Sequence, residues 1–214
     1  DLVIPEGITT IPTEAFKGYE LLTSVTIPKS VISLGNYAFD CPNLKDVYVE
    51  SFEAWFNTCA LSPNFKYAYT YNPMCYAENL YIGGELVVDL VIPEDIKEIP
   101  ANAFSSTDSL KSVTFHSGVT NIADTAFSYC SSLKEVYVPD LETWFKVCDA
   151  IDKSKLDAIY IGGEKVVDLV IPDNVTKIPN RAFRFYKSLE SVSFSSAKYF
   201  SVNAFYDCPN LKSI

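Results

Sequence analysis

The chain has 214 residues and repeats itself three times, which limits its possible folds more than any other feature. The string Asp-Leu-Val-Ile-Pro begins at Asp1, at Asp89 and at Asp168, and each copy opens a module that is then rewritten with substitutions. Repeats of this length are typical of solenoids, in which each coil buries its apolar edge only against the coils above and below it. We therefore expect one solenoid domain built of three modules, at residues 1–88, 89–167 and 168–214.

A shorter unit of about 23 residues recurs within each module. The anchors Leu2, Val25 and Val47 are 23 and 22 residues apart, and each lies in an apolar-x-apolar triplet such as Val25-Thr26-Ile27. This alternation is the period of a strand with one buried face, so stacked coils would form a parallel sheet. A following proline such as Pro28 would end the strand, because proline lacks the N–H that a ladder uses.

Three further elements are expected between the strands. The Ala-Phe pairs, such as Ala38-Phe39, follow an Asn or Asp that can accept free backbone N–H groups, which predicts short helical turns with phenylalanine inside the coil. Ser51 and Asp140 precede segments with one apolar face, and we expect a longer helix after each. Gly83-Gly84 and Gly162-Gly163 predict two tight hairpins, whose second arms we expect to run into the next Leu-Val-Ile-Pro strand.

Composition narrows the classes of partner. The apolar content of 48% is ample for a continuous core, yet no apolar run reaches the roughly 18 residues of a membrane helix. The net charge of −10 disfavours nucleic acid, whose phosphates would be repelled. We therefore expect no membrane insertion and no nucleic-acid partner. Because the first and last residues fall within the repeat, we expect the third module to be truncated and the chain to be a piece of a longer one.

The six cysteines follow the repeat, which indicates that they are architectural. One interpretation is that they are small buried thiols that fill a gap between coils. The other is that Cys41–Cys59 and Cys130–Cys148, each 18 residues apart, form disulfides between adjacent coils. The pattern leaves both interpretations open. The remaining two cysteines are Cys75, in an irregular insertion, and Cys208, whose partner would lie beyond Ile214.

An apolar strand, a proline, an Ala-Phe pair, a cysteine and a leucine recur in this order from Leu22 to Leu44 and, with substitutions, from Leu110 to Leu133. This pattern resembles the BspA-type leucine-rich repeats, and the likeness covers the whole chain. The resemblance implies a curved solenoid on large surface or secreted proteins, mostly of host-associated bacteria, often described as adhesins that bind host proteins. It brings no catalytic residues. We therefore predict an α/β repeat solenoid, a right-handed leucine-rich-repeat superhelix with a parallel sheet face, short helical turns and two Gly-Gly hairpins.

The sequence shows little evidence of a catalytic site. His116 is the one histidine of the chain, and we expect it to be solvated at the edge of a coil, without an orienting acid and a nucleophile. No short Cys/His spacing of a metal site occurs. We expect no enzyme, and no catalytic, cofactor-binding or metal-binding residues.

The outward-facing residues of the strands form a candidate contact surface. The residue between the two buried ones is a tyrosine in four strands, and the preceding outward position is acidic in two of these. Tyrosine beside carboxylate is typical of surfaces that bind proteins or sugars. The predicted partner-binding residues are Tyr48, Tyr81, Tyr137, Tyr160, Asp46 and Glu135.

Two alternatives to this contact surface remain open. Tyrosine is a good strand residue, so the strip can be plain sheet surface. Contacts can also come from the insertion between Cys59 and Leu80, because aromatic loops of that length are often functional. The insertion carries the aromatic residues Phe65, Tyr67, Tyr69, Tyr71 and Tyr76.

These observations lead to a functional expectation. We expect a monomeric, non-enzymatic recognition or adhesion module, extracellular or at the cell surface. It would bind another protein, such as a host extracellular protein, through the strand-lined face. A passive structural spacer and a carbohydrate-binding module that takes a glycan are the alternatives.

Overall fold

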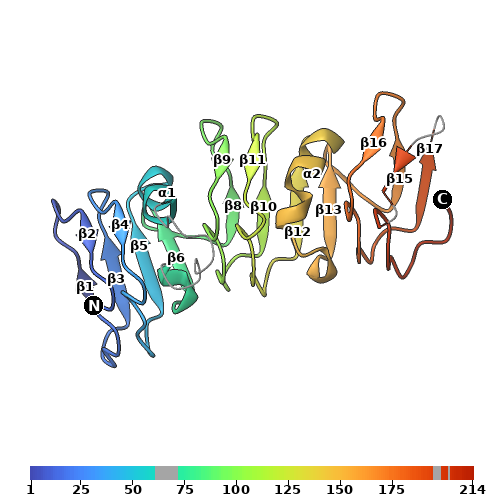
Figure 1. The fold of residues 1–214 in the computed structure, drawn as a ribbon. Helices are drawn as coiled ribbons and strands as arrows, with labels where there is room; N and C mark the ends of the chain where they lie inside the picture. Colours follow the sequence, from blue (N-terminus) through green and yellow to red (C-terminus); the bar gives the residue numbers. More distant parts are fainter. Residues whose placement is uncertain (61–71, 195–198, 202) are drawn as a thin grey trace. The chain divides into compact units, whose positions relative to one another are not determined.

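The computed structural model describes residues 1–60, 72–194, 199–201 and 203–214. They form two compact units, each assembled from coils whose strands lie side by side (Figure 1). In this part of the chain, no helix has the length and apolar character needed to cross a bilayer. The first unit contains residues 1–88, 99–110 and 122–132, and the second contains residues 89–98, 111–121 and 133–214.

The first unit is organised by a five-stranded sheet in the order β1-β3-β5-β6-β7. The first four strands are parallel and in register, so that Val25 lies opposite Leu2 and Val47, while β7 runs antiparallel to β6. A second pair of strands, β2 (Thr10–Ile11) and β4 (Ser33–Leu34), is also parallel. The strands of the main sheet are β1 (Leu2–Val3), β3 (Ser24–Ile27), β5 (Asp46–Val49), β6 (Asn79–Ile82) and β7 (Glu85–Leu86). The helices are α1 (Phe52–Ala60) and the 3-10 turn η2 (Pro73–Cys75).

The second unit repeats this plan. Its main sheet has the order β14-β13-β12-β10-β8, again parallel except for the last hairpin strand, and a new sheet begins with β15 paired to β17. The strands of these sheets are β8 (Asp89–Val91), β10 (Ser112–Thr114), β12 (Glu135–Val138), β13 (Ala158–Ile161), β14 (Glu164–Lys165), β15 (Asp168–Ile171) and β17 (Ser191–Phe194). The helices are α2 (Leu141–Val147), η3 (Cys148–Ala150) and η4 (Lys153–Lys155), and the smaller strands are β16 (Lys177–Ile178) and β18 (Tyr199–Phe200). The paired strands β9 (Glu98–Ile99) and β11 (Asn121–Ile122) each have one residue in either unit.

The phenylalanines of the Ala-Phe pairs stack in the interior, as expected. The ring centroids of Phe16 and Phe39 are 5.5 Å apart and nearly parallel. Equivalent stacks join Phe104 to Phe127 at 5.2 Å and Phe183 to Phe205 at 5.7 Å. On the strands, alternate residues such as Val25 and Ile27 are buried. Consecutive coils therefore share one hydrophobic interior.

The short helical turns predicted at the Ala-Phe pairs are wrong, because these segments are turns without helix. The residue before alanine has a left-handed backbone in several coils, with φ of 56° at Tyr37 and 61° at Arg181. The reason lies in the hydrogen bonds: Phe16 N–H donates to Ala38 O at 2.9 Å, in the next coil. A backbone that bonds from coil to coil cannot also form the bonds of a helix.

The two longer helices and their caps are confirmed. Ser51 Oγ accepts from the N–H of Ala54 at 3.2 Å, and an Asp140 carboxylate oxygen accepts from the N–H of Thr143 at 2.7 Å. Each helix also buries a tryptophan whose ring N–H donates to the carbonyl of an alanine in the following module. The distances are 2.6 Å from Trp55 to Ala103 O and 3.1 Å from Trp144 to Ala182 O, and the sequence did not reveal these bonds.

Both Gly-Gly hairpins are confirmed, and Gly83 and Gly84 adopt φ of 61° and 87°. The expectation that the second arm runs into the next strand is wrong. The arm β7 contains two residues and ends where Val87 N–H donates to Leu80 O at 2.9 Å. The next strand, β8, pairs with β10 instead. Each of the three Asp-Leu-Val-Ile-Pro strings therefore starts a separate sheet.

All six cysteines are free, so the pairings Cys41–Cys59 and Cys130–Cys148 are not formed. The Cys41 thiol donates to Phe16 O at 2.9 Å, and the Cys130 thiol donates to Phe104 O at 3.0 Å. Cys208 makes the same contact with Phe183 O at 3.0 Å. Each thiol thus points to the preceding coil and not forward to the helix. The interpretation as small buried thiols between coils is confirmed for Cys41 and Cys130, whereas Cys59, Cys75 and Cys208 are half-buried.

His116 differs from its expected position at a solvated edge, because its side chain is only 8% exposed. Its Nε2 lies 2.9 Å from Ile96 O, and the N–H of Gly118 donates to Nδ1 at 3.1 Å. Nδ1 also lies 3.3 Å from a Glu94 carboxylate oxygen, an acidic neighbour that the sequence analysis did not expect. The side chain ties together two turns of the second unit.

Candidate interaction surface

The four predicted tyrosines lie on the sheets as two stacked pairs. Tyr48 lies directly opposite Tyr81, with ring centroids 4.4 Å apart and planes inclined by 17°. Tyr137 and Tyr160 are paired in the same way, at 4.5 Å and 5°. The separation of the rings matches the spacing of neighbouring strands, about 4.8 Å, so the sheet itself holds them in contact. The structure brings the tyrosines together within each unit.

Each pair belongs to a column of outward side chains that begins with the smaller valine and threonine on the first two strands of the sheet. In the first unit the column runs through Val3, Thr26, Tyr48, Tyr81 and Leu86. The first member of each module is well exposed: Val3 is 68% exposed, and Val91 and Val170 are each 64% exposed. In the second unit the column is Val91, Thr114, Tyr137, Tyr160 and Lys165.

The two predicted carboxylates lie beside these tyrosines and accept hydrogen bonds from neutral donors. Asn79 donates to an Asp46 carboxylate oxygen at 2.9 Å, and the Tyr137 hydroxyl donates to Glu135 at 2.6 Å. This hydrogen bond, with a smaller effect of desolvation, raises the pKa of Tyr137 to about 12. Desolvation, followed by the charge of Asp46, raises the pKa of Tyr48. Both tyrosines are therefore uncharged donors at neutral pH.

Three Asp-Ser pairs lie at the equivalent outward positions of the three modules, and sequence reasoning missed them. The serine of the second strand donates to the aspartate of the first strand in every module. The distances are 2.6 Å for Ser24 to Asp1, 2.7 Å for Ser112 to Asp89 and 2.5 Å for Ser191 to Asp168. Each pair is 23 residues apart, so the repeat period could have revealed them.

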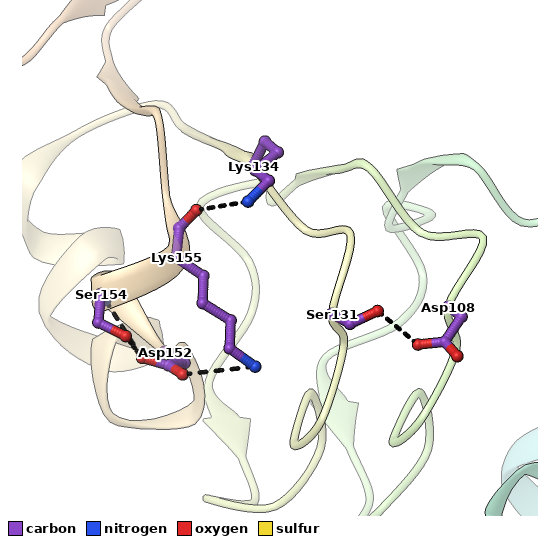
Figure 2. A network of polar contacts seen from close by, with 6 residues as sticks. All are labelled: Asp108, Ser131, Lys134, Asp152, Ser154 and Lys155. Atoms are coloured by element: carbon purple, nitrogen blue, oxygen red, sulfur yellow. Dashed lines mark hydrogen bonds and ion pairs between the residues drawn. The ribbon is translucent and has the colours of Figure 1, made fainter.

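Three of the outward carboxylates carry charge that no nearby cation pairs with in the described ranges. Among the residues that the structure describes, Asp46, Asp89 and Glu135 form no ion pair, whereas Glu14 and Glu190 elsewhere pair with lysines at 2.6 Å. Figure 2 shows the contact of the lysine that is next to Glu135 in the chain. Lys134 precedes Glu135 in the chain, but its ammonium donates to the Lys155 carbonyl at 3.2 Å.

Figure 2 also shows polar contacts within each of the two units. In the second unit, Asp152 accepts from the Ser154 hydroxyl at 2.6 Å and lies 3.8 Å from the Lys155 ammonium. In the first unit, Ser131 donates to Asp108 at 2.6 Å. The charged groups of Asp108, Asp152 and Lys155 therefore make contacts with residues of their own unit.

Of the aromatic residues in the insertion between Cys59 and Leu80, the structure describes only Tyr76. Phe65, Tyr67, Tyr69 and Tyr71 lie outside the described residues. Tyr76 is half-buried, and desolvation raises its pKa. In the described residues, no three His, Cys, Asp or Glu side chains converge where they could hold a metal ion.

Comparison with known proteins identifies the repeat. The family model of the BspA type leucine-rich repeat region matches in six copies, over residues 1–70, 81–148 and 157–214. No curated protein sequence matches the chain.

Solved structures of other leucine-rich repeat proteins are similar to this chain. The structure of a leucine-rich repeat protein from Bacteroides ovatus is 24% identical, with a TM-score of 0.56, over 98% of this chain and 59% of that one. One from Eubacterium ventriosum is 18% identical, with a TM-score of 0.44, over 100% of this chain and 60% of that one. The chain therefore spans about three fifths of the length of these two structures. Because the family model matches nearly all of its residues, the chain belongs to the BspA-type leucine-rich repeat family.

Proposed function

We propose that the chain is a non-enzymatic recognition module, displayed at a cell surface or secreted, that binds another protein through the strand-lined face. The observation that carries this proposal is the pair of stacked tyrosines in each unit, beside uncompensated carboxylates. Tyrosine offers a large, rigid contact area with few rotatable bonds, so it loses little entropy on binding. Membership of a family of repeats without catalytic residues supports the same function.

We also propose that the three modules, at residues 1–88, 89–167 and 168–214, form one continuous right-handed solenoid domain that acts as a monomer. The match of the repeat over residues 1–70, 81–148 and 157–214 supports this arrangement. Solenoids present long binding surfaces because successive coils repeat the same outward positions.

The function is tested by removing the tyrosines of the face. The triple variant Tyr48→Ser, Tyr137→Ser and Tyr160→Ser and the wild type are immobilised and exposed to extracellular-matrix and serum proteins. We expect a protein that the wild type retains to be lost from the variant, with the thermal midpoint nearly unchanged. A matched control changes three exposed tyrosines that lie off the sheets, and it should keep binding. These are Tyr19, Tyr129 and Tyr206, which are 62%, 64% and 51% exposed.

A glycan partner and a passive spacer make different predictions in the same experiment. The stacked tyrosines favour a glycan as the second candidate, because sugar rings pack on aromatic faces. In that case a glycan array would respond to the wild type and not to the triple variant. A spacer would retain nothing on either surface, which would refute recognition by this face.

A further inference from the structure

The second strand of each of the first two modules lies in similar chemical surroundings. In the second unit this strand is β10, which carries the short outward side chains Ser112 and Thr114. On one side β8 presents Asp89 and Val91, and on the other side β12 presents Glu135 and Tyr137. We call these six residues the β10 grid.

The first unit contains a matching arrangement around β3. Here Ser24 and Thr26 lie between strand β1 and strand β5. The outward residues on one side are Asp1, which precedes β1, and Val3. Those of β5 are an aspartate and a tyrosine, where β12 of the β10 grid has a glutamate and a tyrosine. We call Asp1, Val3, Ser24, Thr26, Asp46 and Tyr48 the β3 grid. Nearly the same combination of residue types thus occurs twice, in two separate units.

The β10 grid leaves one face of an aromatic ring beside short side chains. Tyr160 stacks on the face of Tyr137 that lies toward β13, so the other face lies toward Thr114 on β10. The hydroxyl of Tyr137 is bonded to Glu135, which fixes the ring next to that carboxylate. A side chain placed over Thr114 would therefore meet an aromatic face with a negative charge beside it.

Two carboxylates lie on either side of β10, next to this aromatic face. Because β8 and β12 both neighbour β10, the backbones of Asp89 and Glu135 are about 9.6 Å apart, twice the strand spacing of about 4.8 Å. Asp89 accepts from the Ser112 hydroxyl and Glu135 from the Tyr137 hydroxyl, so both are oriented by neutral donors. The position between them is negative, and its complement is a cation.

Arginine fits these surroundings better than lysine. A guanidinium group is flat, stacks on an aromatic face and donates five N–H bonds in a plane, so it can reach carboxylates on two sides. Cations over tyrosine rings are attracted by the ring face, and burial strengthens the attraction. The chain's net charge of −10 further favours a basic partner.

We propose that each grid binds an arginine side chain of the partner protein, stacked on Tyr137 or Tyr48 and bonded to the flanking carboxylates. This inference rests on the proposed function and specifies the chemistry of its partner. The partner is a protein segment that exposes arginine.

The test uses the 15N-labelled chain and the synthetic peptide Gly-Ser-Arg-Ser-Gly, followed by amide chemical shifts. We expect saturable shifts in β10 and β3, and none with the same peptide carrying uncharged citrulline in place of arginine. The double variant Asp89→Asn with Glu135→Gln should weaken binding at β10 at least five-fold and leave β3 unchanged. Tyr137→Ser should do the same, whereas Tyr137→Phe, which keeps the ring, should retain binding.

A matched control separates the grid from general charge attraction. Glu142→Gln with Asp124→Asn removes the same charge from exposed positions off the sheets and should leave both sites intact. Equal shifts with the citrulline peptide, or equal weakening by the control variant, would overturn the proposal. Concentration-dependent shifts of the same amides without peptide would also overturn it, since a second copy would then be the occupant. If the arginine peptide fails while the tyrosine variants still lose a captured protein, the proposed function stands and the arginine chemistry is wrong.

Discussion

Replacing Trp144 by phenylalanine tests how the helix of one module is joined to the following module. The Trp144 side chain is fully buried, and its ring N–H donates to Ala182 O at 3.1 Å. Phenylalanine keeps a ring beside Phe183, whose centroid is 5.8 Å away, but has no donor. The variant therefore removes one hydrogen bond and part of the volume.

The magnitude follows from these two losses. A buried carbonyl left without its donor costs about 1–3 kcal/mol. Indole is larger than phenyl by roughly 40 Å³, and at about 24 cal/mol per Å³ of residual cavity this adds about 1 kcal/mol. We expect the free energy of unfolding to fall by about 2–4 kcal/mol, a large part of the roughly 5–15 kcal/mol typical of native proteins.

Urea unfolding followed by far-UV circular dichroism measures this loss. The midpoint should fall without a change in the slope of the free energy against urea, because the surface exposed on unfolding is the same. Trp55→Phe should cause a similar loss, since its N–H makes the equivalent bond to Ala103 O at 2.6 Å. Phe145→Leu, a change at a half-buried residue of the same helix, serves as the control and should cost less than about 1 kcal/mol. A loss below about 1 kcal/mol in Trp144→Phe would refute the reasoning.

Three further predictions concern protonation and backbone geometry. Burial raises the pKa of the Cys148 thiol from 9.0 to about 11, so its contribution to stability is present below pH 9 and is lost as the pH rises toward 11. Cys148→Ala should reduce this pH-dependent loss of unfolding free energy by up to about 3 kcal/mol in urea titrations at pH 8 and 11. An equal loss between these pH values in the wild type and the variant would contradict the prediction. Tyr137→Phe should remove the tyrosinate absorbance step near pH 12, and an unchanged titration would place that proton elsewhere. Gly35→Ala should destabilise the protein by more than about 3 kcal/mol, because its Cβ would lie 2.1 Å from the Thr13 backbone nitrogen. Gly84→Ala is strained only by its φ of 87° and should cost about 1 kcal/mol. Similar thermal midpoints for the two variants would show that the coils are not packed this closely.

Local patterns in the sequence predicted much of the fold. The strand alternation of Val25-Thr26-Ile27, the cap at Asp140 and the Gly83-Gly84 turn each depend on a few neighbouring residues, and the structure confirms all three. The turn at Ala38-Phe39 could not be predicted in the same way. Its conformation depends on hydrogen bonds to the preceding coil, which local propensity does not report.

In the candidate surface, too, the sequence predicted the features that depend on the repeat period but not those that depend on side-chain packing. The repeat period placed Tyr48 beside Tyr81, because equal spacing puts equivalent residues in register. The bond from Tyr137 to Glu135 depends on side-chain rotamers, and the burial of His116 depends on the neighbouring turn that contains Ile96. Such contacts are set by packing between segments far apart in the chain.

The antiparallel arms β7 and β14 have a consequence for how such a gene can change. Each arm covers the last parallel strand of its sheet, so a sheet ends there with its edge already occupied. Recombination between the DNA segments that encode the identical strings at Asp89 and Asp168 would delete or duplicate one whole module without leaving an unmatched inner strand. We therefore expect alleles of this gene to differ in length by steps of about 80 codons, the distance between those strings.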